Sequence, residues 1–221
     1  MLDSLRVSAI CICLLLAAGM TFSTQAAWTG IGAFVGQSES DWLVGGESRV
    51  ADVNMYGFRI EEKSRTELRV GASAGQISVR LQLPDNSSLA DKYYAQFISF
   101  YLRLPLKITD SISFHSRLNY QFNSGDSSRD DDEEAEIDWT QLDLNLGLSF
   151  TVSNLSLRPF VNFRNIDGDI NTDAGTRVFE EESSYSGGLI FDYAVEPTAY
   201  VRLTATAGER DSLMLSFVRE L

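Results

Sequence analysis

The strongest constraint on the fold is a strict alternation of apolar and polar residues in segments of similar length. Between Ile112 and Phe122, and again between Leu142 and Val152, nearly every even position is apolar and every odd position is polar or small. A period of two gives a β-strand one apolar face and one polar face. Each segment is also close to the roughly 9–11 residues that a tilted strand needs to cross a bilayer.

Reading outward from these segments predicts ten strands joined by links of unequal length. The predicted strands are residues 28–38, 50–61, 67–82, 92–105, 111–123, 139–152, 157–166, 184–194, 199–207 and 213–220. Short links alternate with longer ones at residues 39–49, 83–91, 124–138 and 167–183. Short periplasmic turns opposite longer outer loops are typical of outer-membrane barrels. The sequence therefore predicts an all-β, antiparallel, up-and-down transmembrane β-barrel of ten strands, or of eight if two strands do not pair.

The third predicted strand changes phase in its middle. Leu68 and Val70 share one parity, whereas Ile77 and Val79 share the other. A β-bulge adds one residue to a strand and so exchanges its faces. We therefore expect a bulge near residues 75–76.

The N-terminus has the features of a signal peptide. Arg6 precedes an apolar run at residues 9–20, and small residues suit cleavage after Ala26. The run is too short for the roughly 17–25 residues of a membrane anchor. We expect a signal peptide at residues 1–26, and one barrel domain at residues 27–221 that is exported to the bacterial outer membrane.

Composition excludes some classes of partner. The formal net charge of the 221 residues is −13, and nucleic-acid binding requires clustered Lys and Arg, so we expect no nucleic-acid partner. Both cysteines, Cys11 and Cys13, lie within the expected signal peptide, so the barrel domain would have no thiol.

The polar strand face separates a membrane barrel from its architectural alternative, a soluble periplasmic β-protein. A solvated sheet would use lysine freely, yet Lys63, Lys92 and Lys107 are the only lysines and lie in or next to predicted links. Mid-strand positions instead carry charges that suit a closed lumen: Arg59, Glu61, Glu67, Arg69, Arg103, His115, Arg117, Asp143, Arg164, Asp192 and Arg202. Confined charges persist when they are paired, so a salt-bridged plug is the main interpretation and an ion path is the alternative.

The whole pattern resembles the small outer-membrane barrels of the OmpA and OmpX class. The resemblance covers residues 27–221 and includes the last strand, where Leu213, Leu215 and Phe217 share one face. The chain departs from that class by ending on Leu221 rather than on an aromatic residue. The resemblance implies insertion by the outer-membrane barrel assembly machinery and a lumen too narrow for large solutes. It implies no reaction.

His115 is the only histidine and the one candidate base for an outer-membrane hydrolase. Ser116 points to the opposite face of the strand. Ser113 shares the face of His115, but no oxyanion-hole motif accompanies the pair. We therefore expect no enzyme, and a His115 hydrolase is an alternative.

Two acidic stretches are candidate sites for weakly bound Ca²⁺ or Mg²⁺, and we otherwise expect no cofactor. They are Asp130, Asp131, Asp132, Glu133 and Glu134, and then Asp167, Asp169, Asn171 and Asp173. Hard cations take several carboxylate oxygens, and such an ion would also bridge the first stretch to lipopolysaccharide. The main interpretation of the first stretch is a solvated loop tip. The second has Ala174 where an EF-hand loop requires glycine.

These features together predict a monomeric, non-enzymatic barrel that contributes to envelope integrity or surface interaction. Its expected partners are outer-membrane lipid and lipopolysaccharide. A narrow channel for small solutes or ions is the alternative, because ten strands leave slightly more room inside than eight.

Overall fold

The computed structural model describes residues 28–64, 67–82, 92–127, 135–173, 175–181 and 185–221, so the expected signal peptide lies outside the described residues. Eleven strands are described: β1 (Trp28–Val44), β2 (Glu47–Lys63), β3 (Arg69–Leu81), β4 (Lys92–Lys107), β5 (Ile112–Ser127), β6 (Glu136–Val152), β7 (Leu155–Thr172), β8 (Gly175–Glu181), β9 (Tyr185–Glu196), β10 (Ala199–Gly208) and β11 (Arg210–Glu220). Within these residues, no helix is long and apolar enough to cross a membrane.

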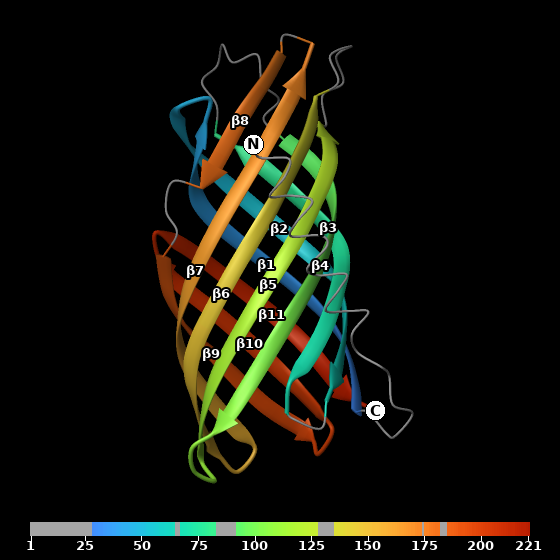
Figure 1. Ribbon diagram of the computed structural model, residues 1–221, viewed down its shortest axis with the longest axis vertical. Coiled ribbons are helices and arrows are strands. Elements are labelled where there is room, and N and C mark those ends of the chain that lie inside the picture. The colour runs from blue at the N-terminus through green and yellow to red at the C-terminus, as the bar shows by residue number, and fades with distance from the viewer. Residues whose placement is uncertain (1–27, 65–66, 83–91, 128–134, 174, 182–184) are drawn as a thin grey trace.

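Ten of the strands close into an antiparallel barrel (Figure 1). Strands β1 to β7 pair in chain order, β7 pairs with β9 as well as β8, and β9, β10 and β11 follow. The ring closes between β1 and β11, from Gly30 opposite Glu220 to Ser40 opposite Arg210. The prediction of an all-β, up-and-down barrel with ten strands is confirmed.

Strand β8 is the element that the sequence did not predict. It pairs with the outer part of β7, where Asp167 lies opposite Glu180, and with the end of β1, where Trp42 lies opposite Glu181. Because β11 pairs with β1 only as far as Ser40, β8 takes over the closure beyond that point. The barrel is therefore closed by ten strands at its inner end and by β1 to β8 at its outer end. The expectation of a loop over residues 167–183 is wrong for the residues described there.

The first predicted long loop, residues 39–49, is also wrong. Strands β1 and β2 stay paired as far as Val44 opposite Glu47, and only two residues connect them. These are Gly45 and Gly46, with φ of 59° and 87°. Positive φ at both central positions is the requirement of a type I′ turn, which matches strand twist and favours glycine.

The two ends of the barrel differ in which strand face is apolar. We call the outer section the part made of residues 37–44, 47–54, 76–81, 92–96, 124–127, 135–140, 165–172 and 175–181, and the membrane section the rest of the ten barrel strands. In the membrane section, apolar side chains point outward, with Phe58 73% and Leu189 49% exposed. In the outer section, apolar side chains point inward and most outward positions are polar. An exposed apolar belt of this kind suits the hydrocarbon core of a bilayer.

Strand β3 passes from one section to the other without a bulge. Its pairing with β2 is continuous, with Gly75 directly opposite Gly57. The expected bulge near residues 75–76 is therefore wrong. Ala74 points outward in the membrane section and Ile77 points inward in the outer section, so the phase change in the sequence marks where the exposed apolar belt ends on this strand.

Candidate functional site

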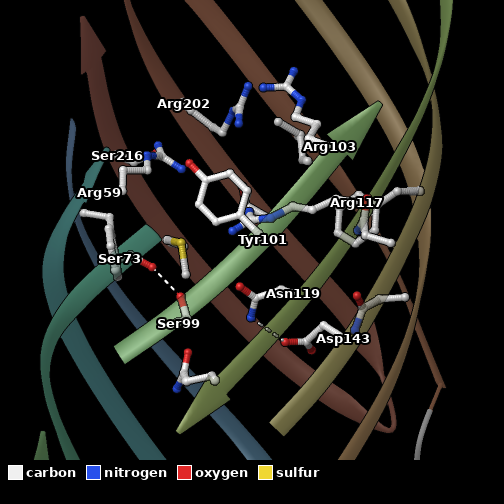
Figure 2. A pocket seen from close by; sticks show the side chains of 18 of the residues that line it. Arg59, Ser73, Ser99, Tyr101, Arg103, Arg117, Asn119, Asp143, Arg202 and Ser216 are labelled. Atoms are coloured by element: carbon white, nitrogen blue, oxygen red, sulfur yellow. Dashed lines mark hydrogen bonds between the residues drawn. The ribbon is translucent and has the colours of Figure 1, made fainter. Parts of the chain in front are cut away.

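A polar cavity of about 190 Å³ lies inside the barrel, and all ten barrel strands contribute to its wall. Inward positions alternate with lipid-facing positions along each strand. The alternation therefore places arginines, amides and serines from strands far apart in the chain around one space. Figure 2 shows this space, with Tyr101 near its middle and arginine side chains from several strands around Tyr101.

Apolar side chains, all but one of them on the strands, close the outer end of the cavity. We call this group the outer apolar cluster: Trp42, Val44, Ala51, Ile77, Val79, Leu81, Tyr93, Ala95, Phe97, Ala135, Ile137, Trp139, Ile166, Ile170 and Phe179. Trp42 stacks on Phe179, with ring centroids 4.8 Å and planes 7° apart, and meets Trp139 edge-on at 6.0 Å. A Cβ at Gly168 would lie 2.5 Å from the Phe179 ring, so only glycine fits there. The bore is thus filled at its outer end.

Inward of this cluster, Asp143 on β6 is surrounded by donors. Arg164 Nε donates to its carboxylate at 2.6 Å and Gln141 Nε2 at 2.7 Å. Asn119 Nδ2 donates to the same carboxylate at 3.3 Å. A buried carboxylate with several charge-assisted and amide hydrogen bonds is stable as an anion. Here the lumen contains a fully satisfied ion pair.

Two further carboxylate groupings lie nearer the inner end. Arg202 on β10 donates to both carboxylate oxygens of Asp192 on β9, at 2.6 and 2.8 Å, which is the bidentate geometry of a strong pair. Arg69 on β3 donates through Nη1 to Glu61 at 2.8 Å and to Glu220 at 2.9 Å. The second grouping joins β2 and β3 to the last strand of the barrel.

Three other arginines have no such partner. Among the described residues, Arg59, Arg103 and Arg117 form no ion pair with a carboxylate. Arg103 on β4 lies directly opposite Arg69 on β3 and Arg117 on β5. Like charges directly opposite each other on one sheet face destabilise the strand pairing. Arg117 places its guanidinium 4.3 Å from the centre of the Tyr101 ring, a cation–π contact that leaves the edge of the group free.

Arg158 and Arg202 complete what we call the arginine cluster: Arg59, Arg103, Arg117, Arg158 and Arg202. Arg158 is only 6% exposed, and its nearest carboxylate is Asp192, at 3.6 Å from Nη2. Within the described residues, no hydrogen-bond partner is found for the Nε atoms of Arg59, Arg103, Arg117 and Arg158. Figure 2 shows four of these side chains, from β2, β4, β5 and β10, surrounding Tyr101.

The structure places most of the sequence-predicted network residues on inward positions. These are Arg59, Glu61, Arg69, Arg103, His115, Arg117, Asp143, Arg164, Asp192 and Arg202. Glu67 is a correction: it lies in the turn before β3, has φ of 64°, and pairs with Lys63 at 2.7 Å while 57% of its side chain is exposed. The strand begins only at Arg69, so Glu67 does not reach the lumen.

Sequence reasoning missed four charged residues of the interior. Arg158 shares the parity of Arg164 on β7, so the alternation alone could have identified it. Arg210 and Glu181 fell in stretches that were interpreted as loops, and Glu220 lies at the end of the last strand. Glu181 is in the outer section, and burial raises the pKa of its carboxyl group.

Among the described residues, His115 has no hydrogen-bonded acid or nucleophile at its Nδ1 atom. It is 9% exposed, and its Nδ1 has no hydrogen-bond partner among the described residues. The residues directly opposite it on the neighbouring strands are Pro105 and Gly147, which offer no side-chain acid or nucleophile. A catalytic triad holds its histidine between a nucleophile and an orienting carboxylate. That geometry is not present around His115 in the described residues.

The expected cation sites fall in two different places. Residues 130–134 lie outside the described residues. Asp167, Asp169 and Asn171 point outward from extended strand β7, where consecutive outward residues are roughly 6–7 Å apart, and Asp173 follows in the turn. Among the residues that the structure describes, no group of three or more His, Cys, Asp or Glu side chains could hold a metal ion.

No family model and no curated protein matches the chain. Solved structures similar in fold include the outer membrane protease OmpT from Escherichia coli, at 11% identity and a TM-score of 0.49, over 91% of this chain and 97% of that chain. The translocator domain of the autotransporter NalP from Neisseria meningitidis is similar at 13% identity and 0.46, over 99% and 98%. Neisserial surface protein A is similar at 9% identity and 0.47, over 87% and 97%. The likeness is one of fold.

Proposed function

We propose that this chain is a monomeric, non-enzymatic barrel of the bacterial outer membrane that closes its own bore and presents the outer section at the cell surface. The observation that carries the proposal is the exchange of the apolar face between the two sections. Lipid would cover the belt of the membrane section, whereas the outer section is built for water outside and apolar packing inside. Such a barrel contributes to envelope integrity or surface interaction, with outer-membrane lipid and lipopolysaccharide beside it.

The outer apolar cluster argues against a channel through the whole bore. Hydrophobic constrictions hold back water and ions by dewetting. This cluster is also deep, because it extends from Phe97 at the wall of the cavity to Leu81 at the outer end of β3. A small ion that entered the cavity would therefore meet packed apolar side chains before reaching the outside.

The outward face of the outer section is negatively charged, which supports a role at the cell surface as a monomer. Carboxylates lie directly opposite one another across β5 to β8: Asp126 with Glu136, Asp138 with Asp169, and Asp167 with Glu180. A concentration of one charge sign repels a second copy and attracts cationic groups. A partner at this face would therefore present basic side chains.

Planar-bilayer recording of the refolded barrel tests the closed bore. We expect the wild type to show no stable single-channel opening, and Trp42→Ala to produce openings because it removes the centre of the cluster. Val178→Ala, on the outward face of β8, is the matched control and should behave as wild type. Stable conductance of the wild type would contradict the proposal and favour the narrow channel.

The hydrolase alternative has a separate test. Wild type and His115→Ala are compared on ester and peptide substrates after both are shown to fold. We expect neither protein to turn over substrate. Hydrolysis by the wild type that the substitution abolishes would contradict a non-enzymatic role.

A further inference from the structure

We propose that the arginine cluster binds a small multivalent oxyanion of the phosphate class, which enters from the inner end of the barrel. This site is additional to the surface role, because it lies in the opposite half of the molecule. It gives the barrel a soluble ligand on its periplasmic side.

Arginines outnumber carboxylates in the inner half of the lumen, which lies between Asp143 and the inner end of the barrel. Six arginines point inward there, and three carboxylates face them; the arginines are Arg69 and the five members of the arginine cluster, and the carboxylates are Glu61, Asp192 and Glu220. Each carboxylate is already bonded to Arg69 or Arg202. The interior is therefore net positive in a chain whose formal net charge is −13. An anion would supply the missing negative charge.

The arginine cluster differs from the complete ion pair between Asp143 and Arg164 in the same lumen. Asp143 binds Arg164 at 2.6 Å and receives two amide donors, as a purely structural plug requires. Arg103 instead lies between Arg69 and Arg117 with like charge on both sides. A buried charge that forms no ion pair destabilises the fold, whereas a bound anion would give the same groups charge-assisted hydrogen bonds. Without a bound anion, the contacts of Arg103 with two like charges therefore destabilise the folded barrel.

The donor geometry selects the class of anion. Guanidinium groups from β2, β4, β5, β7 and β10 reach the cavity, and Arg158 is buried with a free Nε among the described residues. Each guanidinium offers a planar fork of N–H donors. A tetrahedral oxyanion can accept from several forks approaching from different directions, whereas a monovalent carboxylate has only two oxygens in one plane. Phosphate and phosphate monoesters fit this arrangement, as sulfate does.

The direction of entry follows from the two ends of the cavity. The outer end is closed by the outer apolar cluster. At the inner end the side chains of Arg69, Glu61 and Glu220 remain partly exposed, so water reaches that level. An anion dissolved in the periplasm would therefore reach the arginine cluster, and one outside the cell would not.

Thermal unfolding and calorimetric titration of the folded barrel with inorganic phosphate, at constant ionic strength, test the site. We expect phosphate to raise the melting temperature, sulfate to act similarly, and chloride or acetate to have little effect. Arg103→Gln should weaken phosphate binding about tenfold or more, the factor set by one charge-assisted hydrogen bond. Without phosphate, the same variant should melt no lower than wild type, because two like-charge contacts are removed.

Arg80→Gln is the matched control, since it removes the same charge from the outward face of β3. It should bind phosphate as wild type does. The proposal is overturned if phosphate does not stabilise the wild type, if Arg103→Gln binds phosphate unchanged, or if Arg80→Gln loses binding equally. Should Arg103→Gln not fold, Arg117→Gln takes its place; failure of both to fold would show that these arginines hold the barrel together, which also overturns the proposal.

Discussion

The membrane section and the outer section use the same strands with opposite chemistry. On β3 the outward side chains change from Val70, Ala72 and Ala74 to Ser78 and Arg80, while the strand pairing continues without interruption. Inward side chains change in the opposite sense, from serine and arginine to the packed apolar residues of the outer apolar cluster. The backbone geometry is therefore indifferent to the environment, and each side chain is matched to what lies next to it.

The difference in surroundings also explains why the two interiors differ in polarity. Apolar packing holds the outer section together because water surrounds it, so burial of its interior is favourable. Lipid already surrounds the membrane section, so its interior gains little from apolar packing and can hold charged groups. The packed region fills the outer end of the bore, and the polar region contains the site that we propose for an anion.

Phe179→Ala should have the largest effect on stability, because it removes packing from the interior of the outer section and leaves the membrane section unchanged. The side chain is fully buried between Trp42 and Trp139, so truncation leaves a cavity and should cost about 3–5 kcal/mol in the free energy of unfolding. The measurement is reversible denaturant unfolding in lipid vesicles, followed by tryptophan fluorescence. A cost under about 1 kcal/mol, below the range of core truncations, would show that the cluster is not a packed core. Val178→Ala, which is exposed beside it, should change stability by less than about 0.5 kcal/mol.

Alternation in the sequence was enough to predict the ten barrel strands, because parity alone decides which side chains share a face. It was not enough for the outer section, where outward residues such as Glu39 and Asp41 are polar and the segment was assigned to a loop. The segment 124–138 was assigned to a loop for the same reason, although β5 extends to Ser127 and β6 begins at Glu136. Strand β8 is short and has one inward apolar residue, Phe179, so its sequence contains no repeating signal.

The candidate site was likewise predicted only in part from the sequence. Parity predicted that Arg59, Arg103 and Arg117 point inward, as the structure places them. Which charges meet depends on register between strands, and Arg69 bonds to Glu220 at a separation of 151 residues because the ring closes there. No local pattern contains that information. The size of the arginine surplus in the inner half likewise depends on the fold, because Glu67 lies outside the lumen whereas Arg158 and Glu220 lie inside it.

Ala72→Arg and Ser78→Arg would sharpen the boundary between the sections on a single strand. Both positions point outward on β3, six residues apart, and Ala72 lies in the middle of residues 69–75, the part of β3 in the membrane section. Arginine on the lipid face of a barrel costs about 2–4 kcal/mol near the middle of the bilayer and about 0–1 kcal/mol near its edge. We expect the first substitution to cost roughly 2 kcal/mol or more and the second less than about 0.5 kcal/mol, measured by the same vesicle unfolding. Equal costs at the two positions would place the bilayer boundary elsewhere.

Glu181→Gln should have the smallest effect and should appear only as a change in pH dependence. Burial raises the pKa of Glu181 in the folded outer section above its ordinary value of 4.5, so the folded state holds its proton more tightly than the unfolded state does. Wild-type stability should therefore fall as the pH rises from 4.5 through the folded pKa, and the loss should persist at neutral pH. Glutamine cannot ionise, so the variant should lack this decline and be slightly more stable than wild type at neutral pH. Glu180→Gln, on the outward face of the same strand, controls for the loss of one charge. If the stability of wild type and of Glu181→Gln changed with pH in parallel, the interior of the outer section would solvate a carboxylate as well as water does. That outcome would contradict an apolar interior in the outer section.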